Sequence, residues 1–154
     1  MDTASVHRHV RGFTAIEMIV VILLIGIMSA VAMPFIRNAT LKSNVTGAIN
    51  AVASLHSLAR AVAIQRGRTA VLVLDGSTAF AVVVLKRTGS AVVDTVGRPE
   101  NLGSRFGVTL STTQDSVIFT PRGIGTGAAN VTVIAARSGY ADTLTISPAG
   151  RLVQ

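Results

Sequence analysis

Glu17 carries the chemical group of this sequence that most needs an explanation. Its carboxylate stands at the head of an apolar segment, because no charged residue occurs from Met18 to Ile36. A carboxylate costs about 2.5–3.5 kcal/mol at the centre of a bilayer and less near its edge. We therefore expect Glu17 to have a partner that offsets this cost.

Residues that could catalyse a reaction or hold a metal are few and scattered. The sequence has no cysteine and three histidines. We expect His56 to lie on the flank of a helix, and no second histidine near it completes a metal site. The acidic residues beyond residue 37 are isolated from one another, which does not indicate a calcium site: Asp75, Asp94, Glu100, Asp115 and Asp142. We predict neither an enzyme nor a metal centre.

A glycine-rich stretch, Gly-Ile-Gly-Thr-Gly-Ala at 123–128, follows a predicted strand and matches a dinucleotide-binding pattern. A phosphate site of that kind needs a helix N-terminus directly after the glycines. The next predicted element is instead a strand at 130–136. We interpret the glycines as a turn and predict no cofactor.

The elements that must position Glu17 begin with a membrane-length helix. The nineteen residues of 18–36 would span roughly 30 Å as a helix, which is the thickness of a bilayer's hydrocarbon core. Residues 13–36 are therefore a candidate transmembrane helix. Charge does not decide its orientation, because Arg8 and Arg11 precede it and Arg37 and Lys42 follow it.

Beyond residue 36 the apolar pattern remains helical but occupies one face. Apolar residues recur every three to four positions, which predicts an amphipathic helix over 37–67 that packs on a sheet and ends at Gly67. The predicted stripe is Leu41, Val45, Ala48 or Ile49, Val52, Leu55, Ala59, and Val62 or Ala63.

From residue 68 onward, short β-branched runs alternate with turn residues, which predicts strands. Asp75-Gly76 predicts a tight hairpin turn, and Gly97-Arg98-Pro99 predicts a loop. The predicted strands are 69–74, 79–86, 91–96, 106–111, 116–120, 130–136, 143–147 and 151–153. We predict an α+β fold in which the long N-terminal helix packs on a C-terminal β-rich domain of two antiparallel sheets.

The order Gly12, Phe13 and Glu17 at the head of an apolar segment resembles the processing site of type IV prepilins and type II secretion pseudopilins, and Pro34 fits the kinking proline of that family. The resemblance implies that a prepilin peptidase and N-methyltransferase cleaves between Gly12 and Phe13 and methylates Phe13. It also implies a cytoplasmic leader, 1–12, and a single-pass protein of the bacterial inner membrane with a periplasmic domain. Glu17 would meet the N-terminal amine of a neighbouring subunit during assembly.

Later motifs look like those of minor pseudopilins of the GspH/FimT group. They are Leu-Ala-Arg-Ala-Val-Ala-Ile-Gln-Arg-Gly at 58–67, Val-Ile-Phe-Thr-Pro-Arg-Gly at 117–123 and Ser-Pro-Ala-Gly-Arg at 147–151. The resemblance implies a structural subunit at or near the tip of a pseudopilus, with other minor and major pseudopilins as partners. Some FimT-like members bind DNA during uptake, which is the alternative function.

The charge of the exported part bears on that alternative. Residues 37–154 hold twelve Lys and Arg against five Asp and Glu, a bias that favours contact with phosphates. Arg122, Arg137 and Arg151 are the candidate DNA-binding residues. However, they are far apart in sequence, and Gly150-Arg151-Leu152-Val153-Gln154 has one arginine where DNA-binding members tend to have a second.

Two other readings of the N-terminus stay open. Ala30-Val31-Ala32 would suit signal peptidase cleavage after Ala32, and the segment could also be a plain membrane anchor. The long apolar run and its acidic residue favour the interpretation as a prepilin. This interpretation divides the chain into a leader at 1–12, a transmembrane helix at 13–36, an amphipathic helix at 37–67 and a β-rich domain at 68–154.

Overall fold

The computed structural model describes residues 12–86 and 93–153, and the predicted leader therefore lies outside the described residues except for Gly12. The described residues fall into two compact units, which divide after Asn38. One helix, α1 (Ala15–Arg66), runs through the first unit and into the second and contains Pro34. The predicted long N-terminal helix is confirmed.

Local sequence signals define both ends of α1. Thr14 precedes the helix, and its Oγ1 accepts a hydrogen bond from the Glu17 backbone N–H at 3.3 Å, as an N-cap residue does. At the other end Gly67 adopts a φ of 58°, and the Arg68 N–H donates to the Ala63 carbonyl at 3.2 Å. This is the glycine-terminated C-cap expected there.

Two four-stranded antiparallel sheets follow α1 in the second unit, with strand orders β3-β2-β1-β5 and β4-β6-β7-β8. The first sheet consists of β1 (Ala70–Asp75), β2 (Phe80–Lys86), β3 (Val93–Asn101) and β5 (Ser116–Phe119). The second consists of β4 (Thr109–Thr112), β6 (Val131–Arg137), β7 (Tyr140–Ile146) and β8 (Leu152–Val153). A short helix, α2 (Leu102–Phe106), links β3 to β4. The predicted two-sheet α+β class is confirmed.

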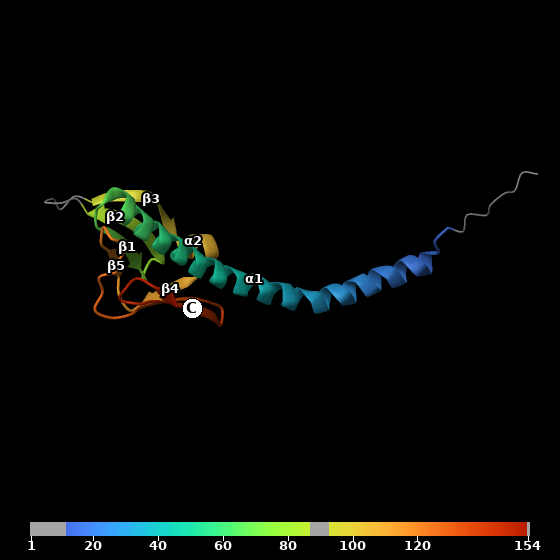
Figure 1. The fold of residues 1–154 in the computed structure, drawn as a ribbon. Coiled ribbons are helices and arrows are strands. Elements are labelled where there is room, and N and C mark those ends of the chain that lie inside the picture. The colour runs from blue at the N-terminus through green and yellow to red at the C-terminus, as the bar shows by residue number, and fades with distance from the viewer. Residues whose placement is uncertain (1–11, 87–92, 154) are drawn as a thin grey trace, which may run out of the picture. The chain divides into compact units, whose positions relative to one another are not determined.

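The core of the second unit lies between the apolar stripe of α1 and the inward-facing residues of both sheets (Figure 1). Alternate residues of β1, β2 and β6, such as Leu72, Val83 and Val133, are fully buried, which is the period-2 pattern of a strand with one face covered. The buried α1 residues are Val45, Ala48, Ile49, Val52, Leu55, His56, Ala59, Val62 and Ala63. The predicted stripe is confirmed, with Leu41 half-buried at its start.

The largest differences from the predicted strand boundaries each have a physical reason. Residues 97–99 are not a loop but part of β3, which lies at the edge of its sheet. Its pairing with β2 shifts register between Ala81 and Val83 of β2. An edge position and a bulge accommodate a Gly with positive φ and a Pro that cannot donate. The strand predicted at 106–111 begins at Thr109, because Asn101 and Gly107 cap α2 before it.

β7 begins at Tyr140, three residues earlier than predicted. Ser138 and Gly139 both have positive φ, 47° and 87°, and β6 and β7 pair from Arg137 and Tyr140 onward. Two central residues with positive φ form the tight turn whose twist matches a hairpin. The β-branched residues of β7 lie beyond that turn, which is why the sequence pattern placed the strand too late.

Candidate functional site

The N-terminal residues expected to be processed are accessible. Gly12 and Phe13 are exposed and lie ahead of α1. In the described chain nothing lies within 4 Å of the position that a Cβ would take at Gly12. Glu17 is in the first turn of α1, where the positive end of the helix dipole stabilises a carboxylate. Thr14-Ala-Ile-Glu17 is also a capping-box sequence, a signal that the sequence analysis overlooked.

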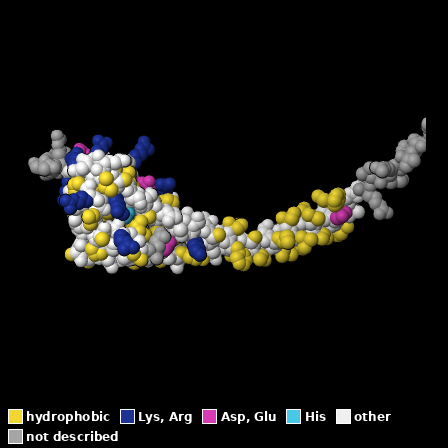
Figure 2. All heavy atoms as spheres, in the orientation of Figure 1, with side chains coloured by type: hydrophobic (Ala, Val, Ile, Leu, Met, Phe, Trp, Pro, Cys, Tyr) yellow, Lys and Arg dark blue, Asp and Glu magenta, His cyan; other side chains and the backbone are white. Residues whose placement is uncertain are grey.

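The apolar segment that follows Glu17 contributes nothing to the core. Every residue from Met18 to Ile36 is exposed, and Figure 2 shows hydrophobic side chains along this part of the helix. By length and composition, α1 is the one helix of the described chain that could cross a membrane. Its one hydroxyl there, that of Ser29, donates to the Ile25 carbonyl at 2.8 Å, so it is satisfied within the helix.

Arg151, one of the three predicted DNA-binding residues, lies beside α1. It lines a cavity of about 510 Å³ between α1 and the residues before β8, hereafter the Arg60–Arg151 cavity. The cavity is lined by His56, Ser57, Arg60, Ala61, Ile64, Gly150, Arg151 and Leu152. Its two arginines come from segments far apart in sequence, and no acidic residue lines it.

Arg122 belongs to the same side of α1. It is exposed in the turn after β5, and its neighbour Gly123 is packed against the helix. A Cβ at Gly123 would lie 2.6 Å from Ile64 Cδ1 and 3.4 Å from Arg60 Cγ. Ile64 and Arg60 both line the Arg60–Arg151 cavity, so the backbone of this turn adjoins it. Figure 2 shows Lys and Arg side chains spread over the visible face of the β-rich unit.

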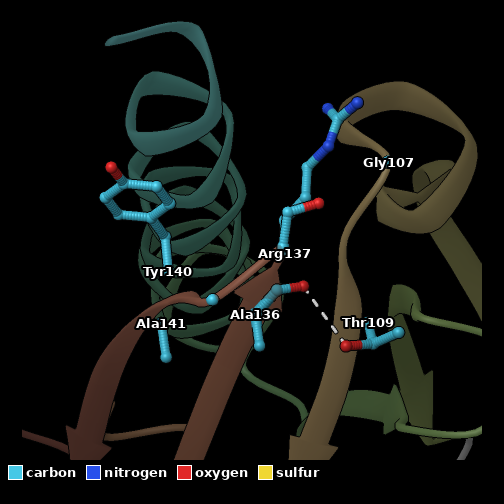
Figure 3. A pocket seen from close by; sticks show the side chains of 8 residues that line it. Gly107, Thr109, Ala136, Arg137, Tyr140 and Ala141 are labelled. Carbon is cyan, nitrogen blue, oxygen red and sulfur yellow. Dashed lines mark hydrogen bonds between the residues drawn. The ribbon is translucent and has the colours of Figure 1, made fainter. Parts of the chain in front are cut away.

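Arg137 is in a different place. Its Nη1 donates to the Phe106 carbonyl, and it lines a second cavity, of about 410 Å³, with Gly107, Thr109 and Tyr140 (Figure 3). Phe106 lies against Gly47 of α1, whereas Arg151 lies beside His56. Nine helical residues separate those two positions, or about 13 Å. The structure thus places the turn that carries Arg122 beside the cavity that Arg151 lines, and it leaves Arg137 outside this region.

Two other basic residues are paired with carboxylates. Arg68 contacts Asp94 at 3.3 Å, and Arg105 contacts Glu100 at 3.0 Å. Within the described residues Arg60, Arg122 and Arg151 have no such carboxylate partner. Their charge is therefore available to a ligand, while that of Arg68 and Arg105 is partly neutralised.

His56 is buried and not on the flank of the helix, which corrects the prediction. Its exposed fraction is 3%, and its ring meets that of Phe119 edge to face at 5.0 Å. Neither Nδ1 nor Nε2 has a hydrogen-bond partner within the described chain. The prediction failed because His56 is four residues after Val52 and three before Ala59, and so continues the buried stripe.

The pKa of His56 is lowered, chiefly by burial of the imidazole. The backbone of Gly150 opposes this effect, and the positive charge of Arg60 adds to it. That backbone contact acts through its proximity, because it does not meet the geometry of a hydrogen bond. Burial therefore favours the neutral form of the His56 imidazole, which lines the cavity.

The glycine-rich stretch after β5 leads into β6. Thr120 and Ile124 close this turn through a backbone hydrogen bond of 2.9 Å, and Phe119 bridges Gly125. No group of three or more metal-binding side chains occurs within residues 12–86 and 93–153. The stretch therefore serves as a turn that holds Gly123 against α1.

Sequence reasoning missed Arg60 and His56 as members of one site. Arg60 was visible as a polar residue off the apolar stripe, but its partner Arg151 comes from the far end of the chain. Only the packing of the 147–151 turn against β5 brings them together. In that packing, a Cβ at Gly150 would lie 2.8 Å from Phe119 Cε1, so the glycine permits the close approach.

Three kinds of comparison relate this chain to known proteins. The family model described as type II transport protein GspH matches residues 48–150. A fimbrial protein of Pseudomonas aeruginosa is 34% identical over 55 residues. Those residues are 36% of this chain and 36% of that protein, so the chain spans about a third of the length of the curated relatives that it matches.

Solved structures share the fold. The type IV minor pilin FimU of Pseudomonas aeruginosa superposes with a TM-score of 0.59 at 18% identity and covers 72% of this chain and 87% of its own. The minor pseudopilin EpsH from the type 2 secretion system of Vibrio cholerae superposes with a TM-score of 0.54 at 14% identity. It covers 70% of this chain and 92% of its own. These likenesses confirm the predicted pilin-like fold.

Proposed function

The chain belongs to the GspH family of type II transport proteins, and from that membership we propose that it is a minor pseudopilin. It is a structural subunit, without catalytic activity or a cofactor, that joins other minor and major pseudopilins at or near the tip of a pseudopilus. The observation that carries this proposal is the extent of the family match, 48–150. That range covers most of the β-rich unit and lies outside the N-terminal motif that all prepilin-like proteins share.

In this proposal the precursor is a single-pass protein of the bacterial inner membrane with its β-rich unit in the periplasm. The exposed apolar residues of 18–36 support a membrane location, because a segment of that kind is costly to leave in water. The prepilin peptidase then cleaves between Gly12 and Phe13 and methylates Phe13.

Gly12→Val tests the processing step. Nothing in the described chain lies within 4 Å of a Cβ at Gly12 or at Gly26. Both substitutions to Val are therefore sterically tolerated by this protein itself. With the peptidase co-expressed, we expect Gly12→Val to retain the leader and Gly26→Val to lose it, measured by the electrophoretic mobility of the membrane-bound protein. Cleavage of Gly12→Val at the normal rate would contradict the processing claim.

Glu17 is proposed to guide assembly by meeting the N-terminal amine of a neighbouring subunit. A partner of that charge would offset the cost of the carboxylate in an apolar setting. We expect Glu17→Ala to be cleaved normally yet recovered poorly with sheared filaments, while Ser29→Ala in the same segment is recovered normally. Equal filament recovery for the two variants would remove this role from Glu17.

A second candidate is a minor pilin that binds DNA during uptake. It is favoured by the unpaired charge of Arg60, Arg122 and Arg151 and by the position of the Arg122 turn beside the Arg60–Arg151 cavity. Because counterions are released on binding, the affinity of a protein that contacts several phosphates falls steeply between about 50 and 200 mM salt. Binding to duplex DNA across that range, by the full chain in detergent, tests this candidate.

The structure sharpens the choice of variants for that test. The sequence alone selects Arg122, Arg137 and Arg151, but Arg137 is held by the Phe106 carbonyl. If DNA binds, the triple alanine variant of Arg60, Arg122 and Arg151 should lose binding, and Arg137→Ala should retain it. An absence of salt-dependent binding in the wild-type chain would leave the pseudopilin as the function to pursue.

A further inference from the structure

The Arg60–Arg151 cavity has the chemistry of a site for an anionic group. Two arginines line it, Arg60 of α1 and Arg151 directly before β8. Its lining residues include no carboxylate that could neutralise them. A planar guanidinium binds a carboxylate through two parallel hydrogen bonds. An anion held between Arg60 and Arg151 would therefore be recognised by charge and by geometry.

His56 gives a second and independent sign of a ligand. It is 3% exposed and lines the cavity, and both of its ring nitrogens are without a hydrogen-bond partner in the part of the chain described. A buried polar group without a hydrogen-bond partner destabilises the folded protein. An oxygen atom of a ligand in the cavity would supply that missing partner.

The border of the cavity is apolar, which bears on the kind of ligand. Ile64 and Leu152, which line it, are 53% and 37% exposed. β8 pairs with β7 on one side only among the described strands, so its other edge presents backbone groups to a partner. No aromatic ring other than that of His56 lines the cavity, so there is little on which a nucleic-acid base could stack.

We propose that this cavity receives the carboxylate of a Glu or Asp from an apolar, extended segment of a neighbouring subunit. The carboxylate lies between Arg60 and Arg151 and accepts a hydrogen bond from His56, while the flanking apolar side chains cover Ile64 and Leu152. The inference rests on the proposed assembly with other pseudopilins and names the chemistry of one such contact. A nucleic acid at the same arginines is the competing outcome.

Binding of such a carboxylate should change the pKa of His56. Burial and Arg60 lower its pKa in the free protein, and a carboxylate beside the ring favours the protonated imidazole. The other charged groups that line the cavity are Arg60 and Arg151. The charge of Arg60 acts against protonation of His56, and the backbone of Gly150 favours it. Binding should therefore raise the pKa of His56 and should be tighter at pH 6 than at pH 8.

The test uses the full chain in detergent micelles and three probes. They are acetyl-Val-Glu-Val-amide, its matched control acetyl-Val-Gln-Val-amide, and a short thymidine oligonucleotide. Each is titrated to about 10 mM, because one charged contact supports affinity in the millimolar range. The readouts are the NMR signals of the His56 imidazole, identified by their loss in His56→Gln, and the pKa that these signals report.

We expect the Glu peptide to shift the His56 signals and raise its pKa, and the Gln peptide to do neither. Arg151→Gln and Arg60→Gln should each weaken binding of the Glu peptide about fivefold or more. Arg98→Gln should not, because Arg98 is an exposed residue of β3 in the other sheet and serves as the matched control.

Three results would overturn the proposal. Binding of the oligonucleotide without the Glu peptide would assign the site to nucleic acid. Equal binding of both peptides would show an apolar groove that does not recognise a carboxylate, and no binding by any probe would show that the cavity is not a site. None of these results touches Gly12 cleavage or Glu17-dependent assembly, so failure here is distinguishable from failure of the proposed function.

Discussion

The two halves of α1 are both rich in apolar residues, yet their surroundings are opposite. All of residues 18–36 are exposed, whereas the stripe from Val45 to Ala63 is buried against the chain's own sheets. The first half is apolar on every face, and the second on one face only. Apolar surface all round a helix indicates an environment supplied from outside the chain, and a stripe indicates a core supplied by the chain itself.

Two phenylalanines give the largest expected contrast between these regions. Phe119 is fully buried, and Phe35 is 72% exposed. Loss of a buried Phe side chain costs about 3–5 kcal/mol through lost transfer energy and a residual cavity. Phe119→Ala should lower the free energy of unfolding of the β-rich unit by that amount in urea titrations, and Phe35→Ala should leave it unchanged. A similar loss for Phe35→Ala would mean that the first half belongs to the core.

Leu24→Lys should have the converse effect. Leu24 is exposed near the middle of the apolar segment, and a lysine at the centre of a membrane helix costs about 2.5–3.5 kcal/mol on insertion. We expect less protein in the membrane fraction with an unchanged urea midpoint for the β-rich unit, and Leu24→Ile as the control should behave as wild type. Full membrane recovery of Leu24→Lys would break the assignment of this half to a bilayer.

The sequence predicted both halves of α1 because each depends on local pattern. A continuous apolar run, a stripe of period 3.6 and Gly67 are readable without tertiary structure. The α2 boundary was missed because Asn101 and Gly107 cap a single turn that β-branched neighbours obscure. The 97–99 segment was missed because its glycine and proline are tolerated only at a sheet edge.

The candidate sites divide in the same way. Gly12, Phe13 and Glu17 are contiguous enough to be recognised as a motif, and their roles stay predictions. The grouping of Arg60, Arg151 and His56 depends on the contact of the 147–151 turn with β5 and α1. No spacing in the sequence encodes that contact. Arg137 is equally basic but lies elsewhere, at the Phe106 carbonyl.

A smaller effect should come from the one buried polar residue of the stripe. The pKa of His56 is lowered by burial. Below about pH 6.5 the unfolded chain therefore binds a proton that the folded chain does not. Stability is fully present above that pH and should fall as the pH falls, by at most about 1.4 kcal/mol per pH unit. Urea midpoints from pH 8 to pH 5 should show this slope in wild type and a smaller slope in His56→Gln.

The smallest effect should come from the β1–β2 turn. The side chains of Ser77 and Thr78 donate to Asp75 at 2.6 and 2.8 Å, and these hydrogen bonds lower its pKa to about 2. Their contribution is present above the unfolded pKa of about 3.9 and is lost as the pH falls through the folded value. Acid titration of Asp75→Asn should show a shallower loss of stability between pH 4 and pH 2 than wild type. If wild type and Asp75→Asn lost stability equally between pH 4 and pH 2, Asp75 would not contribute to the pH dependence there.

The intact mass of the wild-type chain, extracted from membranes after co-expression with a prepilin peptidase, tests the central claim most directly. That claim is that the exposed apolar half of α1 is retained as the membrane and assembly segment of a minor pseudopilin. We expect a protein that begins at Phe13 and carries one methyl group. A protein that begins after Ala32 would contradict it, because the apolar half would then be a signal peptide that is discarded.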